Sequence, residues 1–268
     1  MPSPKTATAT HQSPLATKTT DATLRIREVP AVRRAAAILN LLANNTSGLN
    51  ASHIARELGI VQSTCLHILR ELAGAHLVTK DRSNKTYQLG LGVLSLAKGL
   101  SSHDSFITNA QQRIARFARD YGVSANAQQR EGDDVIVVTA AAASEGLVAP
   151  VGRRSPVLSG SGGQLLGAHA GWSDDELQVR FAQVNWQNPP DFKTWREDAS
   201  RAQQRGYAID DGRQRLGITS MSVAVADRFG KVIRTLSINM VSAQIDPARR
   251  EVLIKALQDA SADVARAL

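Results

Sequence analysis

The chain has 268 residues, which is enough for two domains of ordinary size, each with its own core. Its hydrophobic share of 43% is typical of a globular protein, and its aromatic share of 4% argues against a large aromatic-lined carbohydrate or lipid site. The net charge of +8 is uneven: residues 1–100 contain 12 Lys/Arg and 5 Asp/Glu, whereas residues 101–268 contain 20 and 19. A basic first part favours a nucleic-acid partner there, with a merely solubilising surface as the alternative.

Cys65 is the only cysteine, so neither an intramolecular disulfide nor a multi-cysteine zinc site can form. This usage fits a reducing compartment, and we expect the protein to be cytoplasmic. The histidines lack a paired ligand spacing, so we expect no metal site and no cofactor. No apolar run approaches the ~20 residues that cross a bilayer, so we expect no membrane partner. Residues 1–26 lack an apolar signal core and are expected to be a disordered arm.

The first expected elements are helices. One helix follows Pro30 over about residues 31–43, with an apolar face made by Val32, Ala35, Ile38, Leu39 and Leu42. Asn50 is a suitable N-cap for a second helix over residues 51–58, and Gly59 supplies a tight turn. A third helix follows over about residues 62–73. Its spacing predicts buried positions at Cys65, Ile68, Leu69 and Leu72, and an opposite face with Ser63, Leu66, His67 and Arg70.

Two short strands, residues 77–80 and 85–89, follow around a polar turn. Helix, tight turn, helix and strand pair are typical of a winged helix-turn-helix, whose second helix enters the DNA major groove. Gln62 can pair with adenine, and Ser63 and Thr64 suit phosphates at a helix N-terminus. The predicted DNA-facing residues are Gln62, Ser63, Thr64, His67, Arg70, Lys80, Arg82, Lys85 and Tyr87. The alternative is a helical hairpin used for protein contact.

The second half of the chain mixes helices with strands, which favours an α+β domain. A connecting helix over residues 91–102 precedes it. The expected helices cover about residues 104–121, 174–182, 193–205 and 247–268, and the expected strands cover residues 135–139, 217–226 and 231–241. The last two strands form a hairpin around Asp227-Arg228-Phe229-Gly230.

Two sequence features of the second half have competing interpretations. Ser159–Gly163 reads SGSGG and lacks the spacing of a phosphate-binding loop or of a nucleophile elbow. It is either a close-packed turn into a helix or a helix N-terminus whose amides receive a small carboxylate. Asp210 and Asp211 could act as an acid/base pair, but loop or capping roles are commoner, and no nucleophile or metal set accompanies them. We therefore predict no catalytic residue.

Several segments resemble IclR-type transcriptional regulators. In the first half the resemblance rests on Val32-Arg33-Arg34-Ala35, Ile54-Ala55, Gly59-Ile60, Ser63-Thr64, Leu69, Leu72 and Tyr87-Gln88-Leu89-Gly90. In the second half it rests on Val151-Gly152-Arg153, Pro156, Gly163, Arg205-Gly206-Tyr207-Ala208, Asp210, and the segment from Gly217 through Leu236-Ser237. The resemblance covers about residues 30–268 and is more specific in the first half.

The resemblance implies an N-terminal winged helix-turn-helix over residues 27–90, a linker helix over 91–102, and a C-terminal GAF-like α+β effector-binding and oligomerisation domain over 103–268. It also implies a homodimer or homotetramer that binds double-stranded operator DNA in promoters. By position, the family's effector contacts fall on Ser161, Gly162, Asp210, Ser220, Ser237 and Asn239. These backbone amides and small polar groups suit a carboxylate or hydroxylated ligand. The resemblance implies a small organic effector, a carboxylate or an aromatic compound.

The sequence thus predicts a DNA-binding transcriptional regulator, not an enzyme, whose operator affinity depends on a small organic effector. One alternative is a small-acid hydrolase or isomerase that uses Asp210 or Asp211 and carries an accessory helix-turn-helix. The other is a protein-interaction adaptor that uses the helix pair.

Overall fold

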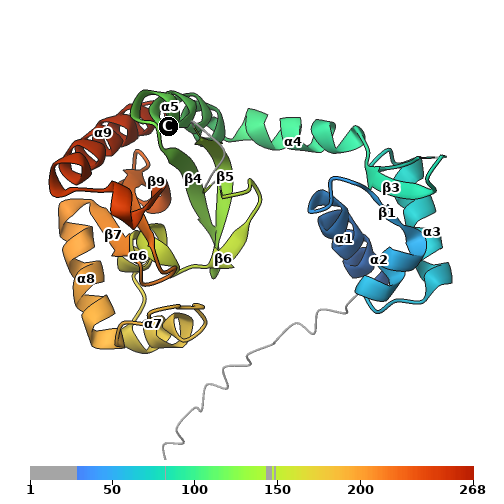
Figure 1. Cartoon of the computed structure of the whole chain (residues 1–268), viewed down its shortest axis with the longest axis horizontal. Coiled ribbons are helices and arrows are strands. Elements are labelled where there is room, and N and C mark those ends of the chain that lie inside the picture. Colours follow the sequence, from blue (N-terminus) through green and yellow to red (C-terminus); the bar gives the residue numbers. More distant parts are fainter. Residues whose placement is uncertain (1–28, 82, 143–146, 148) are drawn as a thin grey trace, which may run out of the picture. The chain divides into compact units, whose positions relative to one another are not determined.

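The computed structural model of the chain describes residues 29–81, 83–142, 147 and 149–268. These residues form two compact units, one ending at Leu94 and the other beginning at Ser95 (Figure 1). The expected arm, residues 1–26, and the predicted contact Arg82 lie outside the described residues. The predicted fold class is confirmed, but the boundaries 27–90, 91–102 and 103–268 stay predictions.

The first unit packs three helices beside a small sheet. Its helices are α1 (Pro30–Ala43), α2 (Ala51–Glu57) and α3 (Gln62–Gly74), and its strands are β1 (Leu49–Asn50), β2 (Val78–Lys80) and β3 (Thr86–Leu89). The sheet has the order β1-β3-β2 with antiparallel pairing, so β2 and β3 form the expected wing. The sequence did not predict β1, which has only two residues.

One apolar cluster holds this unit together. Its most buried members are Ile38, Ile54, Cys65 and Leu69, each 0% exposed. These residues come from all three helices at the predicted helical spacing, so the inward faces were largely correct. Val32 is an exception: it was predicted on the inward face of α1 but is 66% exposed. It lies in the first turn of α1, where its side chain meets solvent.

Helix α4 (Gly92–His103) leads into the second unit. The remaining helices are α5 (Ser105–Tyr121), α6 (Gly160–Ala168), α7 (Asp174–Phe181), α8 (Phe192–Arg205), the 3-10 turn η1 (Ser242–Gln244) and α9 (Pro247–Ala265). The strands are β4 (Ser124–Glu131), β5 (Asp134–Ala142), β6 (Arg154–Pro156), β7 (Tyr207–Asp211), β8 (Ile218–Ala226) and β9 (Val232–Val241). The sequence did not predict β4, β6 or β7.

These six strands form one antiparallel sheet in the order β6-β5-β4-β9-β8-β7. Helices α5 and α9 pack on one face through a cluster that includes Phe106, Met221 and Ile238. Helices α6, α7 and α8 cover the other face, where Leu166 and Trp195 are buried. Sheet and helices therefore make three layers (Figure 1), the arrangement expected of a GAF-like domain.

Strands β8 and β9 form the predicted hairpin, with Val225 opposite Arg234. Because side chains alternate across a strand, their apolar residues face α5 and α9 whereas their small polar residues face α6. The polar set consists of Ser220 and Ser222 on β8 and Thr235, Ser237 and Asn239 on β9. This alternation puts a polar surface in the middle of the sheet, beneath the N-terminus of α6.

Helix α6 lies unusually close to the segment before it because of Gly163. A Cβ atom at Gly163 would come within 2.4 Å of the backbone carbon of Leu158 and 2.5 Å of the carbonyl oxygen of Val157. The close-packing interpretation of Ser159–Gly163 is therefore confirmed.

We expect Gly163→Ala to destabilise the second unit by about 1–3 kcal/mol, because the added methyl group meets backbone atoms that cannot rotate away. Thermal unfolding of the full chain measures this effect. Gly74→Ala is the matched control, since a Cβ atom there meets nothing within 4 Å. Equal melting curves for the two variants would contradict the assigned packing.

Candidate DNA interface and ligand cavity

The helix pair α2–α3 is fixed by local contacts that the sequence predicted. The Asn50 side chain caps α2 by accepting a hydrogen bond from the backbone N–H of His53 at 2.8 Å. Gly59 has a φ of 60°, the left-handed conformation expected of the tight turn. The backbone N–H of Ile60 then donates to the carbonyl oxygen of Ala55 at 2.9 Å. The turn therefore sets the direction in which α3 leaves α2.

The polar side of α3 is accessible at its start and its middle. The side chains of Gln62, Ser63, His67 and Arg70 are exposed, and Thr64 is half-buried. The Gln62 amide nitrogen donates to the Ser52 hydroxyl at 2.9 Å, so this side chain is oriented from α2. The face can therefore present short polar groups and one guanidinium group to a ligand.

The opposite side of α3 belongs to the core. Cys65 and Leu69 are 0% exposed, and burial raises the pKa of the Cys65 thiol. Two details of the prediction were wrong. Ile68 is only half-buried, and Leu66, predicted on the polar face, is half-buried and packs against the cluster. The apolar stripe of α3 is thus broader than the predicted spacing implied.

The wing contributes lysines, but Tyr87 does not belong to its surface. Lys80 and Lys85 are exposed, whereas Tyr87 is 5% exposed and packs in the core cluster. Its ring lies under the Lys80 ammonium group, 5.5 Å from ring centroid to Nζ, so it supports that lysine. The sequence predicted a direct DNA contact for Tyr87, but its burial fits a supporting role under Lys80 better.

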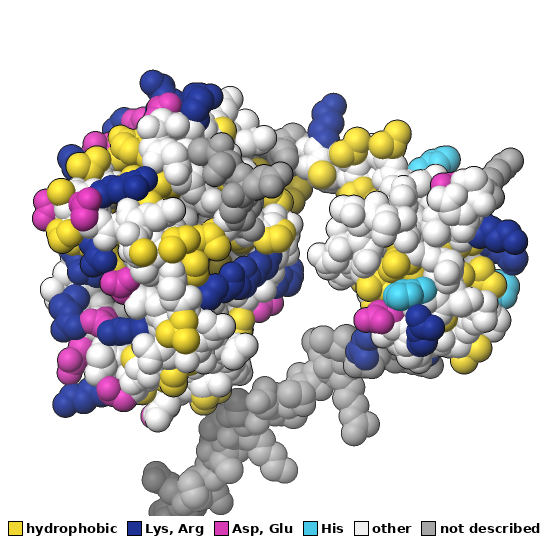
Figure 2. All heavy atoms as spheres, in the orientation of Figure 1, with side chains coloured by type: hydrophobic (Ala, Val, Ile, Leu, Met, Phe, Trp, Pro, Cys, Tyr) yellow, Lys and Arg dark blue, Asp and Glu magenta, His cyan; other side chains and the backbone are white. Residues whose placement is uncertain are grey.

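The basic side chains of this surface are not neutralised locally. Neither Arg70, Lys80 nor Lys85 forms an ion pair within the described part of the chain. Figure 2 shows Lys, Arg and His side chains on the visible face of this unit. Unpaired cations beside an exposed polar helix face suit an anionic polymer.

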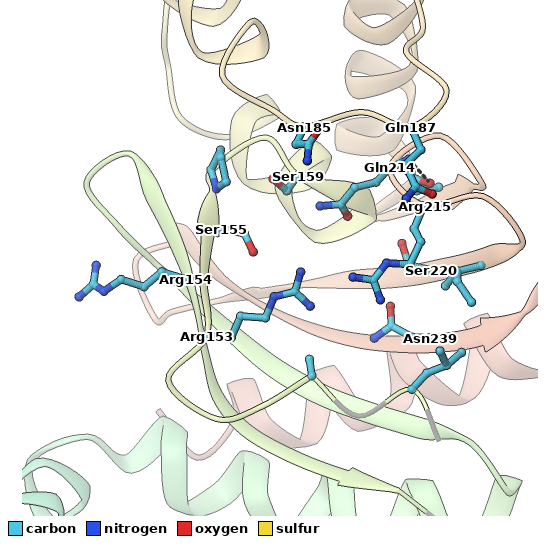
Figure 3. A pocket seen from close by; sticks show the side chains of 15 residues that line it. Arg153, Arg154, Ser155, Ser159, Asn185, Gln187, Gln214, Arg215, Ser220 and Asn239 are labelled. Atoms are coloured by element: carbon cyan, nitrogen blue, oxygen red, sulfur yellow. Dashed lines mark hydrogen bonds between the residues drawn. The ribbon is translucent and has the colours of Figure 1, made fainter. Parts of the chain in front are cut away.

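The second unit contains a cavity of about 470 Å³. It lies beside the N-terminus of α6, at the ends of β7, β8 and β9 (Figure 3). A smaller hollow of about 80 Å³ adjoins it and shares Arg153, Ser159, Gln214 and Asn239 with it. Volumes of this size are typical of small-molecule sites. The lining residues are Leu147, Ala149, Arg153, Arg154, Ser155, Pro156, Ser159, Asn185, Gln187, Asp210, Gln214, Arg215, Ile218, Ser220 and Asn239.

Three of the six predicted effector contacts line this cavity: Asp210, Ser220 and Asn239. The other three lie beneath it. Ser161 and Ser237 are 1% and 2% exposed, and Gly162 is buried at the start of α6. We therefore separate the six into lining groups and groups that support the floor.

The supporting groups form a chain of buried hydroxyls. The Ser161 hydroxyl is 2.9 Å from that of Ser220 and 2.7 Å from that of Ser222, and the Ser222 hydroxyl is 2.7 Å from that of Ser237. The Ser161 backbone N–H also donates to the Ser220 hydroxyl at 3.3 Å. These contacts join the start of α6 to β8 and β9. Ser222 was missed in the sequence, although the alternation of β8 indicates it.

Asp210 holds the turn between β7 and β8. Its carboxylate accepts hydrogen bonds from the backbone N–H groups of Arg213 at 3.0 Å and Gln214 at 3.3 Å. Burial raises the pKa of the Asp210 carboxyl, against the opposing effect of these N–H groups. Asp211 also has a structural partner, because its carboxylate lies 3.1 Å from the Arg250 guanidinium. A hydrogen bond from the Thr219 hydroxyl lowers the pKa of Asp211.

Both units match known families. Residues 31–82 match the IclR helix-turn-helix domain, and residues 98–266 match the family described as bacterial transcriptional regulator IclR C-terminal. The second match covers more than half of the chain. The chain belongs to the IclR family of bacterial transcriptional regulators.

Individual relatives agree with this assignment. The HTH-type transcriptional regulator BhcR of Paracoccus denitrificans is 25% identical over 90% of this chain and 86% of that protein. An IclR regulator from Alicyclobacillus acidocaldarius has a TM-score of 0.78 at 24% identity, over 90% of this chain and 99% of that one. An IclR homologue from Microbacterium hydrocarbonoxydans, complexed with 4-hydroxybenzoate, has a TM-score of 0.74 at 20% identity, over 89% and 98%.

Several lining groups of this IclR chain escaped the sequence analysis. Gln214, Arg215, Asn185 and Gln187 come from connecting turns, which carry no periodic signal. Ser159 precedes the glycines of α6, and its sequence context indicates only a turn. Arg153 lies in a segment that resembles the family, but its sequence context does not indicate a ligand contact. The short basic run Arg213-Gln214-Arg215 beside Asp210 was the one available signal.

The Ser222 hydroxyl stands in the middle of the chain of buried hydroxyls, so its loss should destabilise the second unit. We expect Ser222→Ala to lower the stability of the second unit by about 1–3 kcal/mol, because the Ser237 hydroxyl loses its partner inside the sheet. Chemical denaturation followed by far-UV circular dichroism measures the change. Ser200→Ala, at a half-buried position on α8, is the control, and an equal effect of both changes would contradict a special role for the chain of hydroxyls.

Proposed function

We propose that α3 reads operator DNA and that a small organic acid in the cavity changes the affinity of that contact. The observation that carries the proposal is the match to both IclR domains together with the exposed polar face of α3. Gln62, Ser63, Thr64 and His67 would meet bases and nearby phosphates. Arg70, Lys80 and Lys85, with Arg82 on the sequence alone, would contact phosphates.

An acidic effector is favoured by the basic lining. Arg153 and Arg215 point into the cavity, with Asn239 and Ser220 beside them (Figure 3). Guanidinium, amide and hydroxyl groups together suit carboxylate oxygens. The relative from Microbacterium hydrocarbonoxydans was solved with an aromatic carboxylate, which agrees with an organic acid as the general class.

The strand β9 offers a route from the cavity to the helix junction. It carries Asn239 at the cavity and Arg234 nearer its start. The Arg234 guanidinium holds the carboxylate of Asp104 at 3.0 Å, and Asp104 caps α5 immediately after α4 ends. A ligand that shifts β9 would therefore act on the α4–α5 junction, and differential affinity for two arrangements is what allostery requires.

A second copy of the chain is the proposed partner of α4. Leu94, Leu96 and Leu100 on this helix are each 64–65% exposed, and Figure 2 shows hydrophobic side chains along it. Leu96 and Leu100 are spaced i,i+4 and so share one side of the helix, and exposed apolar side chains favour association. A homodimer, or a tetramer of two dimers, would also supply two α3 helices for two operator half-sites.

We assign the protein a regulatory and non-enzymatic role in the cytoplasm. Within the described residues, no helix is both long and apolar enough to cross a membrane. Asp210 and Asp211, the residues of the hydrolase or isomerase alternative, hold a turn and a guanidinium group respectively. Relatives such as BhcR are regulators by name, which supports the same conclusion.

The DNA contact predicts a specific salt effect. Arg70→Ala should weaken binding to duplexes that the full chain selects from a random library, and the slope of log affinity against log salt should fall by about 1 for the lost phosphate contact. Fluorescence anisotropy across a range of KCl concentrations measures this slope. Arg201→Ala, an exposed position on α8, is the control. An unchanged slope for Arg70→Ala would show that Arg70 does not touch phosphate.

The junction makes a separate prediction. Asp104→Asn keeps the acceptor that caps α5 but removes the negative charge that pairs with Arg234. A hydrogen bond to a charged group is worth roughly 1.5–3 kcal/mol. Backbone amides at the start of α5 should therefore exchange about tenfold faster. Hydrogen–deuterium exchange of Phe106–Ala110 measures the effect. Asp191→Asn, an equivalent cap on α8, should leave that segment unchanged. Unaltered exchange in Asp104→Asn would remove this ion pair from the proposed route.

A further inference from the structure

The charges that line the cavity do not balance. Among the described residues, four charged ones line it: Arg153, Arg154, Asp210 and Arg215. Arg154 points away from the cavity (Figure 3), and its guanidinium lies 2.7 Å from Glu131 on β4 and 3.2 Å from Asp134 on β5. The Asp210 carboxylate is directed to the N–H groups of its own turn. Two guanidinium groups therefore remain for whatever occupies the cavity.

Within the described part of the chain, Arg153 and Arg215 lack the carboxylate partner that several other arginines of the domain have. Arg180, Arg196, Arg213, Arg234 and Arg250 each form an ion pair with a carboxylate. The side chains of Arg153 and Arg215 form neither an ion pair nor a hydrogen bond with any described residue. They approach each other from opposite sides of the cavity, with the Asn239 amide below them (Figure 3). Two like charges held together in a hollow raise its positive potential.

Hydrogen bonds and close packing hold the backbone next to Arg215. Besides the contacts of Asp210, the Asn188 N–H donates to the Arg213 carbonyl at 2.9 Å, and the Leu216 N–H donates to the Gln187 side chain at 2.8 Å. Gln214 packs against Gly160, where a Cβ atom would come within 2.6 Å of its Oε1. Gly160 has a φ of 64°, which favours glycine, so this close approach is built into the start of α6.

The backbone of Arg153 is also anchored. Its carbonyl oxygen accepts the N–H of Val137 at 3.1 Å, and the N–H of Gly152 donates to the carbonyl oxygen of Val137 at 2.8 Å. The two guanidinium groups thus extend from ordered segments, although both side chains are exposed to solvent. The anchored backbone limits the region in which each guanidinium group can lie.

The rest of the lining is mostly polar. Ser155, Ser159, Asn185, Gln187, Ser220 and Asn239 contribute hydroxyl and amide groups, and no aromatic side chain belongs to the described lining. The Ser159 hydroxyl is buried and has no hydrogen-bond partner among the described residues. An unpaired buried hydroxyl is costly unless a ligand satisfies it. The lining therefore suits a compact polar molecule better than a flat apolar ring.

We propose that the cavity binds a small organic dianion, with Arg153 and Arg215 neutralising its two negative charges and Asn239 and Ser159 contacting its oxygen atoms. This rests on the proposed function and narrows its effector from an organic acid to one with two charges. A dicarboxylate and a phosphate ester share this chemistry.

Isothermal titration calorimetry of the full-length chain tests the proposal. The probes are succinate, glutarate, monomethyl succinate, glycerol 3-phosphate and inorganic phosphate in a low-chloride buffer. A second charge held by a guanidinium group should make succinate or glutarate bind at least about tenfold tighter than monomethyl succinate. Arg153→Gln and Arg215→Gln should each remove this preference. Arg154→Gln is the matched control, because its side chain is held outside the cavity.

The outcomes separate the alternatives. Binding of glycerol 3-phosphate alone, lost in both variants, supports the dianion and identifies a phosphate ester as its source. Four outcomes would overturn the proposal of a dianionic effector. They are equal affinity for succinate and its monoester, binding of inorganic phosphate as tight as that of the organic probes, unaltered binding in Arg215→Gln, and no binding of any probe. None of these results bears on DNA binding, which the Arg70 experiment decides, so the regulator can stand when the dianion fails.

Discussion

The contact between helix α6 and the middle of the six-stranded sheet determines the geometry of the effector domain. Gly163 lets the helix approach the backbone of Val157 and Leu158, and the hydroxyls of Ser161, Ser220, Ser222 and Ser237 satisfy one another in the buried space that remains. Buried hydroxyls require partners, so the chain fixes the helix start in one position. The cavity lies directly beside that position, and its shape follows from this contact.

The same region explains why the cavity is polar although the domain around it is not. Strands β8 and β9 turn Met221, Val223, Leu236 and Ile238 towards α5 and α9, where they build the main core. Their alternate residues are small and polar, so they make a surface that only a polar ligand or another polar group can cover. Asp210 then directs the neighbouring turn towards this surface. One sheet thus serves stability on one face and recognition on the other.

The surface of the DNA-binding unit is made by one helix and one wing, so it depends less on contacts between distant segments than the cavity does. Local contacts suffice to build it. They are a side-chain cap at Asn50, a left-handed glycine at Gly59 and an apolar stripe on α3 that includes Cys65 and Leu69. The polar residues of α3 are then exposed because they lie opposite the stripe. Operator binding is the use that we propose for this surface, in keeping with family membership, and helix α4 connects the unit along the chain to the effector domain.

The sequence by itself determined the winged helix-turn-helix and the β8–β9 hairpin, because helical spacing, caps, turn residues and strand alternation act over a few neighbouring positions. It did not indicate β4, whose residues SANAQQRE have weak strand preference; pairing with β5 and β9 on both sides makes this segment a strand. Nor did it indicate that Tyr87 is buried or that Arg153 and Arg215 meet. Those facts depend on segments far apart in the chain, and only tertiary packing brings such segments together.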